Sequence, residues 1–382
     1  MAVQGATIKT EVCIYGESAS GVVAAIQSAR LGKKTLLISK NDHVGGLATS
    51  GLTATDINRQ DQVGGIAAEF YGRIWDHYAQ SDVWRNQTRE EFFELSKKRT
   101  FSGKNDDRQI QWVYESGVAE RIMKDMLAEA GVEVLYNAPL DLDNGAKVKG
   151  GKIRSINLLN GTTVKAKMFL DCSYEGDLMA AAGVSHIIGR ESTEQYGEDL
   201  AGIRNFNLIP TSPYLNGTDG ELIPYVAPEM YGELGEGDHR TQAYCYRVTL
   251  TDDPENMIPI EKPENYNPAL YEIVIRRFET EPDLQLKNII TFTPMPNRKT
   301  DTNHLDFFGA STGYAEGDYA VRARMEQEHK DYAVGMLYCL GHNERVPEHI
   351  RQEMLRWGWP KDEFVENGGF PYQIYVREAR RM

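Results

Sequence analysis

The chain opens with apolar and amphipathic segments whose order predicts a βαβ unit. Residues 8–15 (IKTEVCIY) form a short β-prone run that ends at a glycine, and residues 20–30 carry an apolar stripe at helical spacing. Residues 35–38 (TLLI) are continuously apolar, as expected of a strand buried on both faces of a parallel sheet. Strand, helix and strand fit within about 30 residues, the size of a right-handed βαβ crossover.

The same alternation returns after an interruption. Residues 112–131 predict an amphipathic helix that ends at a glycine, and residues 132–136 and 167–172 predict two further strands. Asn-Gly pairs at 144–145 and 160–161 are typical of hairpin turns. A second set of parallel strands and an antiparallel hairpin region therefore follow the first βαβ unit.

Two regions differ in character from this alternation. Residues 61–100 mix aromatic and charged side chains at helical spacing, which predicts a helical insertion. The chain after about residue 190 is rich in Tyr, Pro, Asn and Gly, with helices expected at 316–340 and 347–357.

The expected fold class is α/β, in two domains. A doubly wound, Rossmann-like domain would comprise residues 1–58 and 113–190, and a mixed α+β substrate or cap domain would comprise the helical insertion at 59–112 and residues 191–382. A length of 382 residues agrees with roughly two domains.

Composition excludes several classes of function. The formal net charge of −14 disfavours a nucleic-acid partner, because an acidic surface repels phosphate backbones. Since no apolar run approaches the about 18 residues that span a bilayer, no membrane partner is expected. The N-terminal residues lack the pattern of a secretory signal, which predicts a cytoplasmic protein.

The four cysteines predict neither a disulfide framework nor a metal site. They are scattered, without a CxxC pair or metal-ligand spacing. We interpret them as reduced thiols, which behave as small apolar side chains, and expect no metal. They are Cys13, Cys172, Cys245 and Cys339.

The motif at residues 16–21 (GESASG) indicates a pyrophosphate-binding turn. It follows a predicted strand and opens a predicted helix, so free backbone N–H groups and the helix dipole would face an anion. Gly16 permits the tight turn and Gly21 permits close packing of helix on strand, while Ser18 replaces the usual middle glycine. The alternative is a tight strand–helix turn that binds no ligand.

The residues after the second strand extend this candidate site. Ser39 and Lys40 stand where dinucleotide folds usually carry an acidic residue that binds ribose. The double glycine Gly45-Gly46 would let the main chain run close to a planar ring. His43 lies beside it and invites a catalytic or covalent-flavin role, but a structural or exposed histidine is the alternative.

These residues, together with residues 170–178 (LDCSYEGDL) and 375–381 (YVREARR), resemble a family of bacterial FAD-dependent oxidoreductases within the glutathione-reductase-like flavoprotein superfamily. The resemblance covers nearly the whole chain and implies FAD as the cofactor. It implies that the backbone at 138–140 meets the adenine and that residues 172–176 close the site. The residues that it assigns to the cofactor are Gly16, Ser18, Ala19, Ser20, Gly21, Ser39, Lys40, Val44, Gly45, Gly46, Leu47, Ser50, Leu140, Cys172, Ser173 and Gly176.

The sequence departs from the family pattern in two ways. Ser39 replaces the family's usual acidic residue, and the last strand and helix that return to the FAD domain are missing after residues 375–381. A fragment, or a truncated variant with a partly open flavin site, is therefore expected. Gly317-Asp318 imitates a late cofactor motif, but the highly charged helix after it indicates a decoy.

Candidate substrate residues are polar and cationic. Residues 296–304 predict a polar loop that contains Arg298, Lys299 and Asn303, and Arg377 and Arg380 lie near the C-terminus. Guanidinium groups could clamp a carboxylate or hydroxyl-rich substrate. The alternative is a solvated loop together with a charged helix face in ion pairs.

Three hypotheses remain open from the sequence. The first is an FAD-dependent oxidoreductase that transfers a hydride from a small organic substrate, possibly hydroxylated or carboxylated, to flavin. The second is a module with the same fold that binds no flavin, and the third is a nicotinamide-dependent dehydrogenase. The loop at 45–51 suits a buried flavin better than a dissociable nicotinamide. Catalytic residues and oligomeric state are left open.

Overall fold

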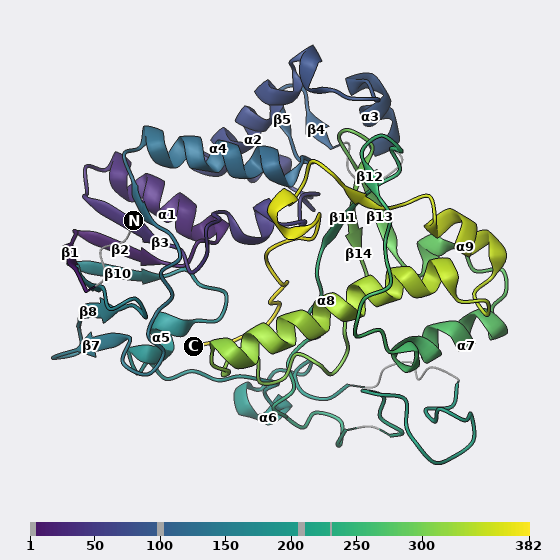
Figure 1. The fold of residues 1–382 in the computed structure, drawn as a ribbon. Helices are drawn as coiled ribbons and strands as arrows, with labels where there is room; N and C mark the ends of the chain where they lie inside the picture. The colour runs from purple at the N-terminus through teal and green to yellow at the C-terminus, as the bar shows by residue number, and fades with distance from the viewer. Residues whose placement is uncertain (1–4, 98–102, 205–210, 230) are drawn as a thin grey trace.

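A computed structural model describes residues 5–97, 103–204, 211–229 and 231–382. It places two α/β halves side by side, with a helical segment above them (Figure 1). The centre of the first half is a four-stranded parallel sheet. In spatial order its strands are β10 (Met168–Asp171), β2 (Val12–Tyr15), β3 (Thr35–Ile38) and β6 (Glu133–Leu135).

Different layers cover the two faces of this sheet. Ile14 and Leu37 pack against the helices α1 (Ala19–Arg30) and α4 (Ser116–Glu129). The neighbouring side chains Cys13 and Leu36 point to the other face. That face packs on a second sheet of order β1-β9-β8-β7, whose strands are Thr7–Lys9, Thr163–Lys165, Ile153–Asn157 and Ala146–Val148. Burial on both faces explains why residues 35–38 are continuously apolar.

The helical character predicted for residues 61–100 is confirmed where the structure describes them. The helices are α2 (Gly65–Tyr78) and α3 (Arg89–Ser96). Thr88 and Glu91 form a capping box at the start of α3, which fixes its first residue. The remaining elements are the 3-10 turns Gln60–Gln62 and Ser81–Val83 and the strands β4 (Lys104–Asn105) and β5 (Ile110–Gln111).

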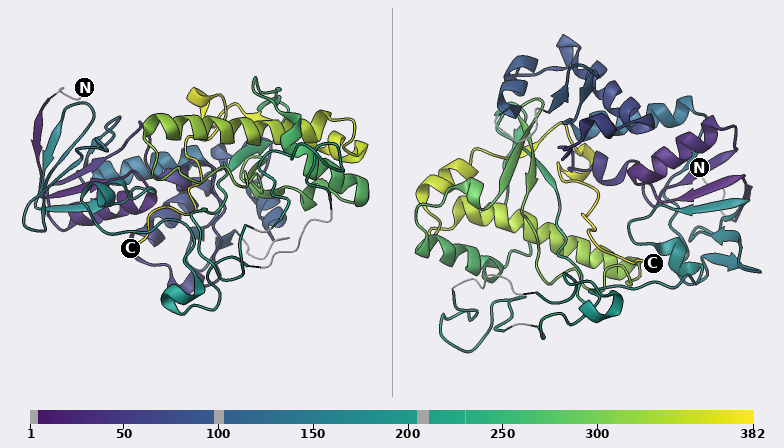
Figure 2. Two further views of the ribbon diagram at one scale, coloured as in Figure 1. Left: turned by 90° about the horizontal axis from the view of Figure 1, so that it is seen from below. Right: turned by 180° about the vertical axis from the view of Figure 1, so that it is seen from behind.

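The second half is a mixed α+β unit built around the long helix α8 (Tyr319–His342). The N-terminal end of α8 lies near α5 (Asp177–Ala181), and its C-terminal end lies near α9 (Glu348–Met354) (Figures 1 and 2). An antiparallel sheet of order β11-β14-β13 packs in the same core. The strands are β11 (Val248–Thr251), β12 (Met257–Ile258), β13 (Thr291–Met295), β14 (Lys299–Asn303) and β15 (Trp359–Pro360), and the helices besides α8 are α7 (Glu272–Thr280) and α9 (Glu348–Met354). The short helices α5 (Asp177–Ala181) and α6 (Thr193–Tyr196) lie in the link from the first half. The 3-10 turns are Gly46–Thr49 in the first half and Pro268–Tyr271, Leu286–Asn288 and Val365–Asn367 in the second.

Three predicted elements differ in the structure. The run at 8–15 divides into β1 and β2, because the chain passes at Glu11 from one sheet to the other, and the amides of Glu11 and Val12 both donate to the Lys34 carbonyl. The helix predicted at 112–131 begins at Ser116, since Val113 forms a β-bridge with Ala54.

The third difference concerns the hairpin turns. The pair at 160–161 does connect two paired strands, β8 and β9, as predicted. The pair at 144–145 instead precedes β7, and the β7–β8 connection turns at Gly150-Gly151, both with positive φ.

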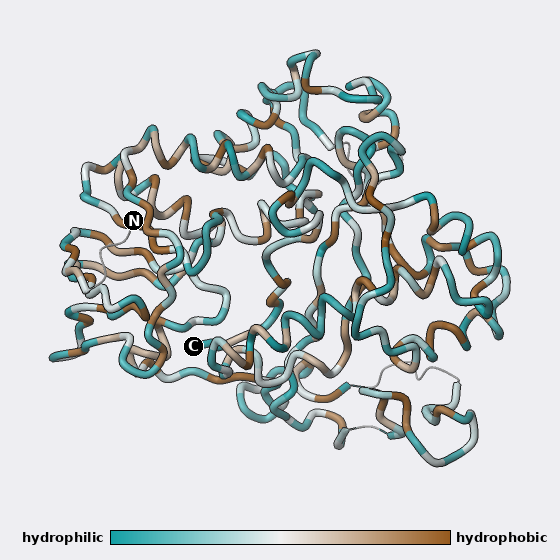
Figure 3. Tube along the Cα trace, viewed as in Figure 1, coloured by the Kyte–Doolittle hydropathy of each residue, from teal (hydrophilic) through white to brown (hydrophobic). Residues whose placement is uncertain are grey.

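The α/β, Rossmann-like fold class is confirmed by the parallel sheet and its crossover helix. Hydrophobic residues are prominent along the sheet strands, whereas many outer turns are hydrophilic (Figure 3). Within the described ranges, no helix combines the length and the apolar character needed to cross a membrane.

Candidate cofactor site

The turn at residues 16–21 joins β2 to α1 and packs directly on the backbone after β10. Gly16 has φ +110°, and a Cβ atom there would lie 2.3 Å from the Cys172 carbonyl carbon. The Cys172 amide donates to the Tyr15 carbonyl at 2.7 Å, which holds the two segments together. A glycine at position 16 is therefore required by the close approach of two backbones, whether or not a ligand binds.

Ser18 is the N-cap of α1. Its Oγ accepts a hydrogen bond from the Gly21 amide at 3.3 Å and donates to the Cys172 carbonyl at 2.6 Å. Ser20, on the first turn of the helix, is exposed, and its Oγ lies 2.8 Å from the Ser18 Oγ. The predicted strand–turn–helix geometry is present, and the N-terminal end of α1 is positioned to face an anion.

The double-glycine segment meets this turn, as the family resemblance implies. The Gly45 amide donates to the Glu17 carbonyl at 2.7 Å. The Leu47 amide donates to the Tyr174 phenol oxygen at 2.8 Å, and a Cβ at Gly46 would lie 2.3 Å from that oxygen. Tyr174 thus packs on the double glycine, and residues 45–47 lie beside the turn.

Ser39 and Lys40 have separate roles at the end of β3. Ser39 is fully buried, and its Oγ lies 2.9 Å from the Asn41 carbonyl oxygen and 3.0 Å from that of His43. Its hydroxyl therefore shapes its own loop. The Lys40 Nζ lies 2.9 Å from Glu175 Oε1, and its backbone amide donates to Glu17 Oε2 at 3.3 Å.

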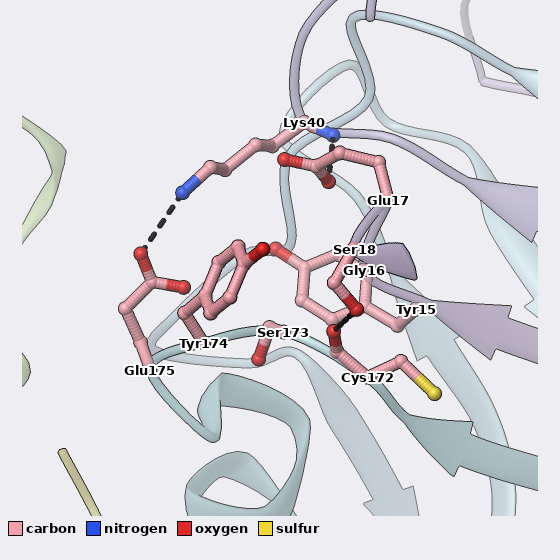
Figure 4. A pocket seen from close by; sticks show the side chains of 9 residues that line it. All are labelled: Tyr15, Gly16, Glu17, Ser18, Lys40, Cys172, Ser173, Tyr174 and Glu175. Atoms are coloured by element: carbon pink, nitrogen blue, oxygen red, sulfur yellow. Dashed lines mark hydrogen bonds and ion pairs between the residues drawn. The ribbon is translucent and has the colours of Figure 1, made fainter. Parts of the chain in front are cut away.

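These groups enclose a small cavity (Figure 4). Its volume is about 10 Å³, which is room for one water molecule. The Lys40 side chain extends across the cavity to Glu175, with Tyr174 beneath it and Glu17 beside the Lys40 backbone. The lining residues are Tyr15, Gly16, Glu17, Ser18, Lys40, Cys172, Ser173, Tyr174 and Glu175.

Charges in the site are buried and shift one another's protonation. Burial raises the pKa of the Glu17 carboxyl above its usual value. Burial also disfavours the Glu175 carboxylate, but Lys40 and Arg322 outweigh this effect and hold its pKa below the usual value. Burial disfavours the Lys40 ammonium too, yet Glu175 and Glu17 raise its pKa overall.

A second set of ion pairs adjoins the cavity. Asp177 accepts hydrogen bonds from both terminal nitrogens of Arg322, at 2.6 and 2.7 Å. Arg380 Nη1 lies 3.0 Å from Asp177 Oδ1 and 2.9 Å from the Glu175 carbonyl oxygen. Arg380, predicted as a substrate candidate, therefore lies at the predicted cofactor site, beside Gly176.

Two tyrosine hydroxyls form hydrogen bonds with the backbone of Leu140, which the family resemblance places at the adenine. The Leu140 amide donates to the Tyr15 Oη at 3.2 Å, and the Tyr319 Oη donates to the Leu140 carbonyl at 3.0 Å. Tyr319 is the first residue of α8, so the second half of the chain reaches into this position. The adjacent Asp318 caps α8 by accepting from the Val321 amide at 2.8 Å, which is the role of Gly317-Asp318 here.

The polar loop predicted at 296–304 is wrong. Residues 299–303 form β14, the central strand of its sheet, with only a tight turn at 297–298 before it. Arg298 forms an ion pair with Asp252 at 3.0 Å, and Asn303 ends the strand. A strand forms because distant partners pair with these polar side chains, which sequence spacing does not reveal.

Lys299 is buried rather than solvated. Its Nζ lies 2.6 Å from Glu115, 2.9 Å from Asp362 and 3.4 Å from Glu363. Arg377 pairs with Asp306 at 2.5 Å, on a segment that is extended and not the charged helix that the alternative interpretation assumed. These cations already have carboxylate partners and do not converge with Arg380 on one point in the described structure.

His43 has structural neighbours. Its ring stacks on Tyr372 at 3.5 Å between centroids, and its Nδ1 lies 3.1 Å from Glu120 Oε1. Ser50 accepts from the amides of Tyr372 and Gln373, which fixes the same C-terminal segment to the loop. Among the described residues, no group of three or more His, Cys, Asp or Glu side chains is arranged to hold a metal ion.

Sequence reasoning missed seven residues of the site: Tyr15, Glu17, Tyr174, Glu175, Asp177, Tyr319 and Arg322. Glu17 and Tyr174 lie inside the quoted motifs and could have been named from them. Arg322 is 145 residues from its partner Asp177, and no local pattern connects them. Tyr319 begins a helix that the sequence assigned to the other domain.

The donor chemistry of this site fits the diphosphate of FAD, whereas the space does not fit it in the described arrangement. The turn, the start of α1 and the Lys40 ammonium are the groups that bind phosphate. However, the cavity that these residues line, about 10 Å³, is by itself too small for a diphosphate. Glu17 and Glu175 add two buried carboxyl groups, and their negative charge would repel the diphosphate.

Known structures resemble only part of the chain. L-proline dehydrogenase from P. horikoshii is 16% identical, with 49% of this chain and 59% of that chain covered and a TM-score of 0.32. L-amino acid deaminase from Proteus vulgaris is 13% identical, with 50% and 55% covered and a TM-score of 0.33. The chain thus spans less than two thirds of the length of either protein. No curated protein sequence matches the chain.

A family profile covers almost the entire sequence. The profile described as FAD dependent oxidoreductase matches residues 11–382, from the start of β2 through the C-terminal arginines. The match includes the turn, the double glycine and the segment after β10 that together form the site. The chain therefore belongs to the family of FAD-dependent oxidoreductases.

Proposed function

We propose that this protein binds FAD non-covalently and oxidises a small organic substrate by hydride transfer to the flavin. The observation that carries the proposal is the turn at 16–21, which lies at the carboxyl end of β2 and the N-terminal end of α1, with Lys40 in front of it. Ligands of α/β sheets bind outside the carboxyl ends of the strands. The chemistry of the oxidation would come from the flavin, which accepts the hydride.

The chain's own residues would bind and orient the cofactor. Backbone N–H groups at the start of α1 would face the diphosphate, with Ser18 and Ser20 as small side chains that leave access to it. Lys40 would contribute a cation. Residues 45–47 would lie beside the diphosphate and flavin, where their backbone approaches without bulky side chains.

Binding would require a local rearrangement. Lys40 and Tyr174 fill the space in front of the turn, so both side chains must rotate away before a diphosphate enters. Once displaced, Tyr174 remains available to cover the ligand and to exclude water from it.

The visible absorption spectrum of the purified protein tests this proposal. We expect a yellow protein that releases FAD on denaturation. Ser20→Glu is the sharpest variant, because Ser20 is exposed and an acidic residue in the first turn of a helix does not destabilise it. The new carboxylate would repel the diphosphate, so the variant should fold and lose FAD. A folded Ser20→Glu variant that retains FAD fully would contradict the placement of the diphosphate.

A second candidate is a module that keeps the fold but binds no flavin. The filled cavity and the two buried carboxylates favour it. A colourless protein that takes up no added FAD would establish this alternative.

A further inference from the structure

The ammonium of Lys40 has an internal partner where a bound phosphate would be expected. Glu175 Oε1 lies 2.9 Å from Lys40 Nζ, and the Glu175 side chain is only 1% exposed. The two side chains come from opposite sides of the cavity, Lys40 from the end of β3 and Glu175 from the loop after β10 (Figure 4). The Lys40 ammonium, which faces the turn at 16–21, is thus already paired with an ionised carboxylate.

We propose that Glu175 is an internal competitor of the cofactor diphosphate, so that FAD binds only when Lys40 exchanges the Glu175 carboxylate for a ligand phosphate. The proposal rests on the proposed function and adds to it a closed state of the site. Closing pairs the partly buried Lys40 ammonium with the fully buried Glu175 carboxylate, which would be unfavourable without a cation.

The cavity is surrounded by ionisable groups. Three cations, Lys40, Arg322 and Arg380, adjoin three carboxylates, Glu17, Glu175 and Asp177. Asp171 and Glu326 add further carboxyl groups, so a diphosphate would bring more negative charge to an acidic site unless Lys40 leaves Glu175 to pair with it. Glu175 is near Arg322 on α8, whose charge already stabilises its ionised form. Other ionisable side chains that interact with these groups are Tyr15, Asp171, Tyr174, Tyr244, Tyr314, Tyr319 and Glu326.

The first turn of α8 reinforces the closed state at both ends of the site. Tyr319 contacts the Leu140 carbonyl, and Arg322 holds Asp177. Both residues belong to the second half of the chain, whereas their partners belong to the first half. Opening of the site is therefore expected to involve the contact between α8 and the loop at 172–177.

The kinetics of FAD binding to flavin-free protein test the exchange. If Lys40 must leave Glu175 first, the observed association rate should reach a plateau as the FAD concentration rises, because opening becomes limiting. Glu175→Gln removes the competing charge but keeps a side chain of the same size, so the fold should persist. The plateau rate should rise, and the dissociation constant for FAD should fall by about tenfold, the value of one charge-assisted hydrogen bond.

Glu17→Gln is the matched control. It removes the same charge from the same cavity, but Glu17 accepts a hydrogen bond from the Lys40 backbone amide, and its charge acts on the ammonium without the direct ion pair that Glu175 makes. Its plateau rate should stay at the wild-type value. An association rate that rises linearly with FAD in the wild type, or a Glu175→Gln variant with unchanged or weaker FAD binding, would overturn the proposal while leaving the proposed function intact. Absence of FAD binding in wild type and both variants would overturn both.

Discussion

Glu363, on the C-terminal segment, accepts a hydrogen bond at 3.0 Å from the backbone amide of Gly117, in the first turn of α4. The two residues are separated by 246 positions and join the second half of the chain to the parallel-sheet half. Glu363 is almost fully buried and shares Lys299 with Glu115 and Asp362. We call this cluster the interlock, because it joins the two halves of the chain. Its members are Glu115, Lys299, Asp362 and Glu363.

The interlock should make stability depend on pH. Burial raises the pKa of Glu363 to about 7 from 4.5, although Lys299 opposes the shift. A carboxyl whose pKa is raised by folding binds its proton more tightly in the folded state. Its contribution to stability is therefore fully present below pH 4.5 and is lost as pH rises to about 7. Thermal unfolding measured from pH 4.5 to 8 should show this decline, and Glu363→Gln should make it shallower. An unchanged slope in the variant would refute the assignment.

Removing the cation of the interlock should be more harmful than any change of its carboxylates. Lys299→Met leaves Glu115 and Glu363 buried without their partner, which should cost about 3–5 kcal/mol of unfolding free energy. The neighbouring Arg298→Ala is the control, because its pair with Asp252 is partly exposed and should contribute about 0–1 kcal/mol. Urea unfolding of both variants gives the comparison. Equal losses would show that burial of Lys299 is not the cause.

Gly16, in the turn at 16–21, should be more sensitive to an added methyl group than Gly32, although both have a positive φ. Gly16→Ala would place its Cβ 2.3 Å from the Cys172 backbone, so β2 and β10 would have to separate. Gly32→Ala, at φ +76° after α1, meets no atom within 4 Å and should cost only the left-handed backbone strain, about 1–2 kcal/mol. Circular dichroism melting should therefore show a much larger fall for Gly16→Ala. Similar melting temperatures would contradict the predicted clash.

The sequence predicts the parts of the site that depend on local pattern. The strand–turn–helix unit follows from periodicity and glycine spacing, and it is present. The family resemblance places residues 45–47 beside the pyrophosphate, and the Gly45 amide does contact the turn. The contents of the cavity depend on distant contacts. Tyr319 and Arg322 arrive from a helix more than a hundred positions away from Leu140 and Asp177, and no spacing rule connects such pairs.

The loop predicted at residues 296–304 is wrong for the same reason. A run of polar and cationic side chains predicts a solvated loop unless buried partners exist, and those partners are Asp252, Glu115 and Arg247. The glutathione-reductase-like superfamily, the truncation, the domain boundaries and the cytoplasmic location stay predictions. The family match at residues 11–382 bears on the fold and the class of chemistry, not on these points.

Asp301 should control the order of the loop that follows the double glycine. Its Oδ2 accepts hydrogen bonds from the amides of Thr53 and Ala54, at 3.1 and 3.0 Å. Its Oδ1 forms an ion pair with the buried Arg247. Asp301→Ala would leave the Arg247 guanidinium without this carboxylate and two buried amides without an acceptor, a loss of about 3–5 kcal/mol.

The loss should be local before it is global. Within residues 51–55, Thr53 and Ala54 bind β14 through the Asp301 carboxylate, so the amide hydrogens of these two residues should exchange much faster in the variant than those of β3, which packs inside the parallel sheet. Hydrogen exchange followed by mass spectrometry separates the two segments. Asp301→Asn is the graded control, because its amide oxygen can take the place of Oδ2 and accept both N–H groups while the ion pair with Arg247 at Oδ1 is lost. If 51–55 kept wild-type protection in the alanine variant, the loop would be held by contacts other than this carboxylate.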